Sequence, residues 1–108
     1  MRDRANARFV PSRSVTVAFE ARDTPRAYGV VANLSDGGAC VWTDARLEAG
    51  QQVSLAVSFA RASRPVAAEA RVVWTGPETG SATRRYGMQW DTKTPEAPHL
   101  RRLISESA

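Results

Sequence analysis

Two short stretches of the chain carry residue types suited to binding an anion or the edge of a nucleobase. The first is RANAR, residues 4–8, in which Arg4 and Arg8 are four residues apart. In an extended segment, residues at this spacing point to the same side and lie about 13 Å apart. A guanidinium group donates two parallel hydrogen bonds to a phosphate or to the O6/N7 edge of guanine. The pair therefore predicts a ligand gripped at two points.

The second stretch is NLSDGG, residues 33–38. Asn33 and Ser35 offer hydrogen-bond donors and acceptors, while Gly37 and Gly38 permit positive φ and close approach of the backbone. The same residues also make an ordinary connection between strands, with Asn33 closing an Asx-turn. Both interpretations stay open at this point: a plain turn, or a concavity that suits an anion or a base edge.

Catalysis finds little support in the sequence. His99 is the only histidine and lies in the carboxy-terminal tail, while the only cysteine, Cys40, lies on an expected strand. No C-x-x-C or comparable metal-ligand spacing occurs, and no nucleophile stands near a general base in the sequence. We therefore expect no enzyme activity, no catalytic residue, no metal and no cofactor, and we interpret Cys40 as a small core residue.

Composition indicates one soluble domain. The chain has 108 residues, of which 43% are hydrophobic and 24% charged, and its net charge is +4. No apolar run approaches the roughly 20 residues that span a bilayer, no signal peptide is recognisable, and one cysteine cannot form an internal disulfide. A cytoplasmic location is the expectation. Lys93 is the only lysine among 15 basic residues, a bias explained either by a G+C-rich genome or by a partner that carries phosphate.

Alternation of apolar and polar residues predicts six short strands and no long helix. Turn-forming stretches separate the strands, and near-regular spacing of this kind is typical of a small antiparallel barrel. In the tail, Leu100, Leu103 and Ile104 share one face of a short helix over residues 99–107. The expected strands cover residues 14–21, 28–32, 39–42, 53–60, 66–74 and 85–90.

The first dozen residues differ from the rest of the chain. They are polar and rich in arginine, with little apolar surface to bury. We expect residues 1–12 to form a flexible arginine-bearing segment and residues 13–108 to form the barrel with its helix.

Together, the two stretches resemble the signature of the PilZ domain, a bacterial receptor module for cyclic di-GMP. R-x-x-x-R corresponds to Arg4 and Arg8, and [D/N]-x-S-x-x-G corresponds to Asn33, Ser35 and Gly38. The resemblance continues through GGACVWTDARLEAGQQVSLAVSF, EARVVW and YGMQW, so it extends from about residue 4 to residue 104. It implies an all-β fold, a six-stranded antiparallel barrel with a short carboxy-terminal helix.

The resemblance also implies a function: binding of cyclic di-GMP in bacterial second-messenger signalling. The implied ligand residues are Arg4, Arg8, Asn33, Ser35, Gly37 and Gly38. A base also needs a stacking surface, for which Trp74 is preferred and Trp42 is the alternative; either tryptophan is equally explained as a core side chain. Ligand binding is expected to order residues 1–12 and to signal to a downstream protein of the motility, pilus or exopolysaccharide machinery.

Two other functions remain open. A basic small barrel also suits single-stranded nucleic acid, through a positive groove and stacking aromatic side chains. A protein adaptor that binds no nucleotide is the third possibility, although the intact arginines and glycine turn count against it. DNA binding and a membrane segment are not expected.

Overall fold

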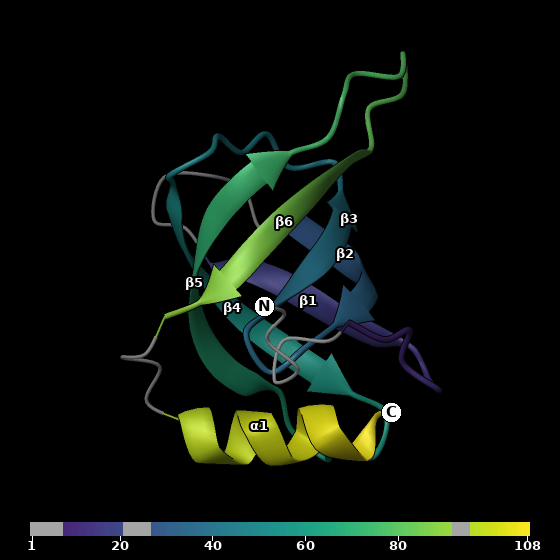
Figure 1. The fold of residues 1–108 in the computed structure, drawn as a ribbon, viewed down its shortest axis with the longest axis vertical. Coiled ribbons are helices and arrows are strands. Elements are labelled where there is room, and N and C mark those ends of the chain that lie inside the picture. Colours follow the sequence, from purple (N-terminus) through teal and green to yellow (C-terminus); the bar gives the residue numbers. More distant parts are fainter. Residues whose placement is uncertain (1–7, 21–26, 92–95) are drawn as a thin grey trace, which may run out of the picture.

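The computed structural model describes residues 8–20, 27–91 and 96–108 of the chain. Within these ranges it contains six strands and one helix (Figure 1). They are β1 (Val15–Glu20), β2 (Ala27–Leu34), β3 (Gly38–Thr43), β4 (Gln52–Phe59), β5 (Val66–Thr75), β6 (Arg84–Trp90) and α1 (Ala97–Glu106).

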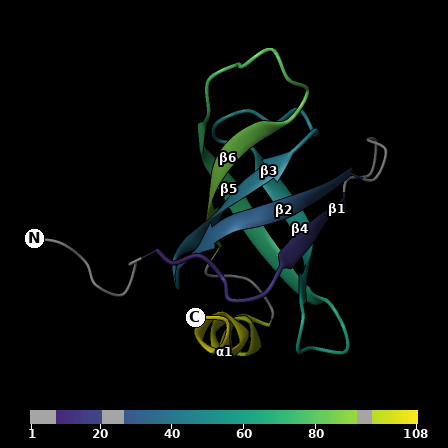
Figure 2. The same cartoon turned by 90° about the vertical axis from the view of Figure 1, so that its right-hand side faces the viewer.

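The strands form a closed antiparallel barrel in the order β1-β2-β3-β6-β5-β4. Closure depends on the pairings β1 with β4 and β3 with β6, which join strands that are not neighbours in the chain. The helix α1 lies across one end of the barrel, and the connection between β5 and β6 extends from the opposite end (Figures 1 and 2). The predicted fold class, a six-stranded antiparallel barrel with a short carboxy-terminal helix, is confirmed.

Alternation along the strands explains the core. Every second residue of β1 and β4 is buried, and β-branched side chains predominate among them, as expected for strands with one face in a barrel interior. The helix contributes Leu100, Leu103 and Ile104 to the same cluster, so its predicted apolar face closes the barrel end. The helix begins at Ala97, earlier than predicted, because a proline is tolerated in the first helical turn.

One boundary departs from the prediction in a way that affects the site. β2 continues through Asn33 and Leu34, whereas the sequence suggested that both belong to a loop. The register shifts between Val31 and Asn33, which marks a bulge. Leu34 then exchanges two backbone hydrogen bonds with Phe9, at 2.8 and 2.9 Å. Asn33 and Leu34 also pair with Cys40 and Ala39 of β3, so pairing past the bulge extends β2, and the isolated bridge to Phe9 adds a contact that local sequence does not reveal.

No helix in the described part of the chain is long and apolar enough to cross a membrane.

Candidate functional site

The turn between β2 and β3 is held by the side chain of Ser35. Its hydroxyl oxygen accepts hydrogen bonds from the backbone N–H groups of Gly37 (3.2 Å) and Gly38 (3.1 Å). The backbone N–H of Ser35 donates to the carbonyl of Gly38 at 2.9 Å. Ser35 is only 3% exposed. Serine, and not the expected asparagine, thus forms the side-chain-stabilised turn.

A glycine is needed at position 38 because β3 and β6 approach each other closely there. A Cβ atom on Gly38 would overlap the backbone carbonyl oxygen of Met88. The φ angle of Gly38 is not in the left-handed region. The sequence suggested that this glycine could allow either positive φ or close approach of the backbone. The structure shows the close approach and not the positive φ.

Trp90 fixes the turn against the end of β6. Its backbone N–H donates to the carbonyl of Gly37 at 2.9 Å, and its indole N–H donates to the carbonyl of Ser35 at 3.4 Å. Both bonds hold the turn from the barrel side. The turn is therefore preformed in the protein without ligand, which lowers the entropy lost when a ligand binds.

Arg8 is brought to the same place by the pairing of Phe9 with Leu34. Its guanidinium Nη1 donates to the side-chain Oδ1 of Asn33 at 2.9 Å. Asn33 therefore orients an arginine instead of closing an Asx-turn. The guanidinium keeps its other N–H donors for a ligand, and the amide group of Asn33 keeps its own. Arg4 lies outside the described residues.

The outer face of the barrel between these groups is lined by small residues. Asn33 pairs with Cys40, Cys40 with Gly87, and Gly87 with Trp74, in a row across β2, β3, β6 and β5. An open hollow of about 360 Å³ lies beside this row. It is lined by Arg8, by Ser35, Gly37 and Gly38 of the turn, and by Val73, Met88 and Gln89 of β5 and β6.

A bulge in β5 places Trp74 on the outside of the barrel. Alternation along β5 buries Val66, Ala68, Ala70 and Val72, which predicts an inward side chain at position 74. The register shifts between Val72 and Trp74, so Val73 is the extra residue and Trp74 faces outward, 36% exposed. Its indole ring covers Gly87, where a Cβ atom would overlap the ring. Trp74 is thus not a core side chain, and it forms one wall of the small-residue row.

Trp42 is also partly exposed, at 41%, and lies on β3 opposite Arg85 of β6. The Cζ atom of Arg85 is 5.6 Å from the ring centroid of Trp42 and 5.6 Å from that of Trp74. Neither tryptophan is therefore buried in the core, and one arginine links the two rings through cation–π contacts.

Cys40 is a small buried residue, as expected, but it lies outside the cluster that fills the barrel interior. Its neighbours Ala39 and Val41 are part of the core cluster, while Cys40 itself is not, because alternate residues of β3 face opposite sides. Burial raises the pKa of its thiol, and the positive charges of Arg85 and Arg8 oppose that increase. The raised pKa favours the neutral thiol, which fits a structural role and not that of a nucleophile.

A second and larger hollow, of about 580 Å³, lies between α1 and the connection from β4 to β5. Its lining mixes Arg61, Arg64 and Arg102 with Glu96 and Glu106. His99 is there too, with its Nδ1 3.0 Å from a guanidinium nitrogen of Arg102. None of the motif residues lines this hollow, so we assign the candidate site to the hollow beside Arg8.

The structure thus brings most of the predicted residues together. Arg8, Ser35, Gly37 and Gly38 line one hollow, Asn33 is bonded to Arg8, and Trp74 stands across the row of small residues. Sequence reasoning missed Val73, Gln89 and Arg85. In the sequence these three residues are marked only by lying on expected strands. They reach the site because β6 pairs with β3 and β5 when the barrel closes.

A model of the PilZ domain matches residues 2–106 of the chain. The chain belongs to the PilZ domain family. No curated protein sequence matches it significantly. Solved structures with the same fold include the PilZ domain of YcgR from Escherichia coli with c-di-GMP (TM-score 0.71, 15% identity, 97% of this chain and 91% of that one).

Longer proteins also contain this fold. YcgR from Escherichia coli in complex with c-di-GMP matches with TM-score 0.72 and 18% identity, over 95% of this chain and 45% of that one. MrkH from K. pneumonia in its apo state matches with TM-score 0.75 and 11% identity, over 99% of this chain and 51% of that one. The PilZ chain described here therefore spans about half the length of these two proteins. At such identities the likeness establishes the fold alone.

Proposed function

We propose that this PilZ domain is a receptor for cyclic di-GMP. The observation that carries the proposal is the convergence of Arg8, Asn33 and the Ser35–Gly38 turn on one hollow, with Trp74 across the small-residue row. Membership of the PilZ family and the c-di-GMP in the two YcgR structures support it.

The chemistry of the site suits this ligand. Cyclic di-GMP carries two guanines and two phosphates, and a guanidinium pairs with the O6/N7 edge of guanine or with a phosphate. Trp74 is 36% exposed, and the exposed part of its ring is the candidate surface for a base to contact. The residues around the hollow supply donors and acceptors, and Trp74 beside them supplies a ring, which together suit a binding role.

We further propose that the ligand orders the amino-terminal segment. Phe9 is bonded to Leu34 of β2, and Arg4 precedes Arg8 by four residues in the sequence. Charge-assisted hydrogen bonds from both arginines would offset the entropy lost on ordering residues 1–7. Ligand and segment together would then form a new surface for a downstream protein in the bacterial cytoplasm.

Calorimetry with cyclic di-GMP tests the receptor role. The expected dissociation constant is micromolar or lower, which corresponds to about −8 kcal/mol. Arg8→Ala should weaken binding by about tenfold or more, whereas Arg61→Ala, the same charge change beside the other hollow, should leave it unaltered. Cyclic di-AMP should bind much more weakly, because adenine presents an N6 donor where guanine presents the O6 acceptor.

The result that contradicts the proposal is no binding, or equal affinity for both dinucleotides. A salt titration distinguishes cyclic di-GMP recognition from non-specific binding of single-stranded nucleic acid. Affinity for an oligonucleotide falls steeply with added salt because many counterions are released, whereas recognition of one dinucleotide falls far less. Tight binding of an oligonucleotide in place of cyclic di-GMP would favour the nucleic-acid function.

A further inference from the structure

Arg85 is held in place by two aromatic rings on the outside of the barrel. It lies opposite Trp42 on β3, and its Cζ atom is 5.6 Å from each of the two indole centroids. Stacking of this kind restricts a long side chain that otherwise samples many rotamers. A guanidinium that contacts a ring through its face keeps the N–H donors at its edge. Arg85 is therefore a preorganised cation whose guanidinium N–H groups are available to a ligand.

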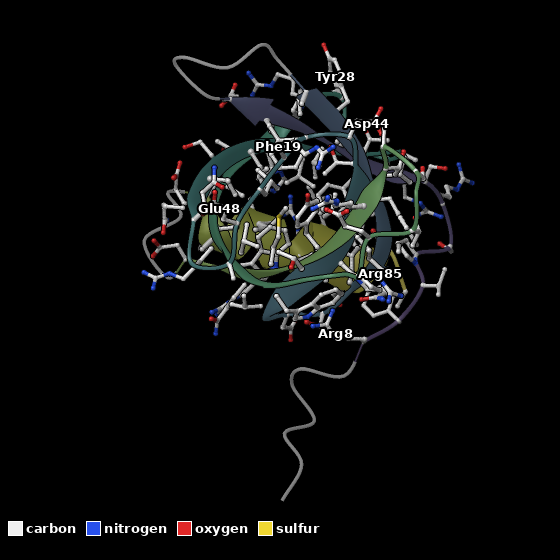
Figure 3. The ribbon with its side chains drawn as sticks, turned by 90° about the horizontal axis from the view of Figure 1, so that it is seen from above. Arg8, Phe19, Tyr28, Asp44, Glu48 and Arg85 are labelled. Carbon is white, nitrogen blue, oxygen red and sulfur yellow. The ribbon has the colours of Figure 1, made fainter. Side chains whose placement is uncertain are left out.

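The position of Arg85 relative to the hollow follows from the strand register. Gly87, two residues further along β6, points to the same side as Arg85 and pairs with Cys40 of the small-residue row. The charges of both Arg85 and Arg8 act on the Cys40 thiol. Seen from above, Arg8 and Arg85 lie on the same side of the barrel, away from Tyr28 and Phe19 (Figure 3). Arg8 is bonded to Asn33 at one end of the small-residue row, and Arg85 contacts Trp74 at the other end. The two guanidinium groups therefore flank this row.

Arg85 has no carboxylate partner among residues 8–20, 27–91 and 96–108. The salt bridge of the neighbouring residue, Arg84, is made with Glu78, and no acidic side chain in the described residues forms one with Arg85. The cation–π contacts leave its formal charge unneutralised. A cation that is fixed, partly exposed and free of an acidic partner is suited to bind an anion.

We propose that Arg85 is a further ligand residue of this domain, pairing with a phosphate of the dinucleotide on the side of the site opposite Arg8. The inference rests on the proposed function and adds a contact that lies outside both sequence motifs. Two cations at opposite ends of the small-residue row match a ligand with two phosphates. The two tryptophans hold Arg85 at the edge of the site, so little entropy is lost when it engages the ligand.

Three variants separate charge from packing at this position. Arg85→Gln keeps a polar side chain of moderate length but removes the charge, and Arg85→Lys keeps the charge but loses the planar fork. Arg61→Gln makes the same charge change at an exposed position in the β4–β5 connection. Each variant is titrated with cyclic di-GMP by calorimetry, and urea unfolding checks that the fold is intact.

We expect Arg85→Gln to weaken binding by about tenfold or more, the usual effect of losing a charge-assisted hydrogen bond. Arg85→Lys should lose clearly less affinity than Arg85→Gln, because lysine also binds phosphate as a point charge although it lacks the planar group that stacks on the two tryptophans. Arg61→Gln should bind like the parent. Binding by Arg85→Gln equal to that of Arg61→Gln overturns the proposal. An equal loss in the lysine and glutamine variants also overturns it, because Arg85 would then only support the tryptophans.

Arg8→Gln, titrated in parallel, distinguishes the two proposals. If the parent binds and Arg8→Gln is weakened while Arg85→Gln is not, the inference about Arg85 fails and the receptor function stands. If the parent does not bind cyclic di-GMP, both fail together.

Discussion

At the scale of single residues, two glycines of the site make room for atoms of other strands. Gly38 admits the carbonyl of Met88, and Gly87 admits the ring of Trp74. A side chain at position 38 would push β3 and β6 apart, and one at position 87 would displace the indole ring of Trp74. Their role is therefore steric, and it can be tested apart from ligand binding.

Replacement of Gly38 by alanine should destabilise the free protein. The added Cβ atom overlaps the backbone of β6, which cannot move aside as a flexible side chain would. We expect the free energy of unfolding to fall by about 1–3 kcal/mol, the range found for overpacked sites. Urea unfolding measures this loss. Gly50→Ala is the comparison for backbone strain without overlap, because Gly50 has open space around it but a φ of 90°. Unchanged stability of Gly38→Ala would contradict the close approach of β3 and β6.

Cys40 predicts a dependence of stability on pH. Burial raises the pKa of its thiol in the folded protein above that in the unfolded chain. The unfolded chain therefore loses its proton first as pH rises, and the stability that is complete below the unfolded pKa declines as pH rises through the folded pKa. Urea unfolding from neutral to alkaline pH should show this decline in the parent. Cys40→Ala should show a smaller one, and identical profiles would count against the raised pKa.

Some residues of the candidate site could be predicted from the sequence, and others, such as Arg85, could not. The motifs pointed to Arg8, Asn33, Ser35 and Gly38, which lie together at the candidate site, because their order and spacing are distinctive in combination. Arg85 was missed because an arginine on a strand has no distinctive local pattern. Its contact with two tryptophans arises from pairing between β3 and β6, which are far apart in the chain.

At the scale of elements, alternation predicted the strands to within a few residues of their ends, because a barrel strand buries one face. The bulges could not be predicted in this way. One carries Asn33 into β2, and the other turns Trp74 outward although alternation alone would bury it. Both bulges lie next to the hollow, so local irregularity in the sheet helps to form the site.

The amino-terminal segment is the element whose behaviour should change with ligand. We expect the amides of residues 2–7 to exchange rapidly in the free protein and slowly at saturating cyclic di-GMP, because Arg4 and Arg8 close on the ligand. The amide of Phe9 donates to Leu34 without ligand, so it serves as an internal control that is protected in both states. Hydrogen exchange measured by mass spectrometry or NMR follows both.

Two outcomes would contradict this switch. Protection of residues 2–7 in the free protein would mean that the segment is already ordered. Rapid exchange at saturating ligand would mean that Arg4 takes no part in binding. In either case ligand and segment would not form the new surface that we propose.

At the scale of the whole molecule, the barrel acts as a rigid frame with the site on its outer wall. The core cluster fills the interior and α1 closes one end, so no ligand need enter the barrel. The turn held by Trp90 and the arginine held between two tryptophans are both positioned before any ligand arrives. Binding should therefore stabilise the folded state without rearranging the barrel.

Cyclic di-GMP should raise the melting temperature of the domain. A ligand that binds only the folded state stabilises it by about 2.7 kcal/mol when its free concentration is 100 times the dissociation constant. For a domain of this size, that corresponds to a rise in Tm of about 10 °C. Differential scanning calorimetry over a range of ligand concentrations should show Tm rising with the logarithm of concentration. Cyclic di-AMP at equal concentration should raise it far less, and a Tm that does not respond to cyclic di-GMP would mean that the folded domain does not bind it.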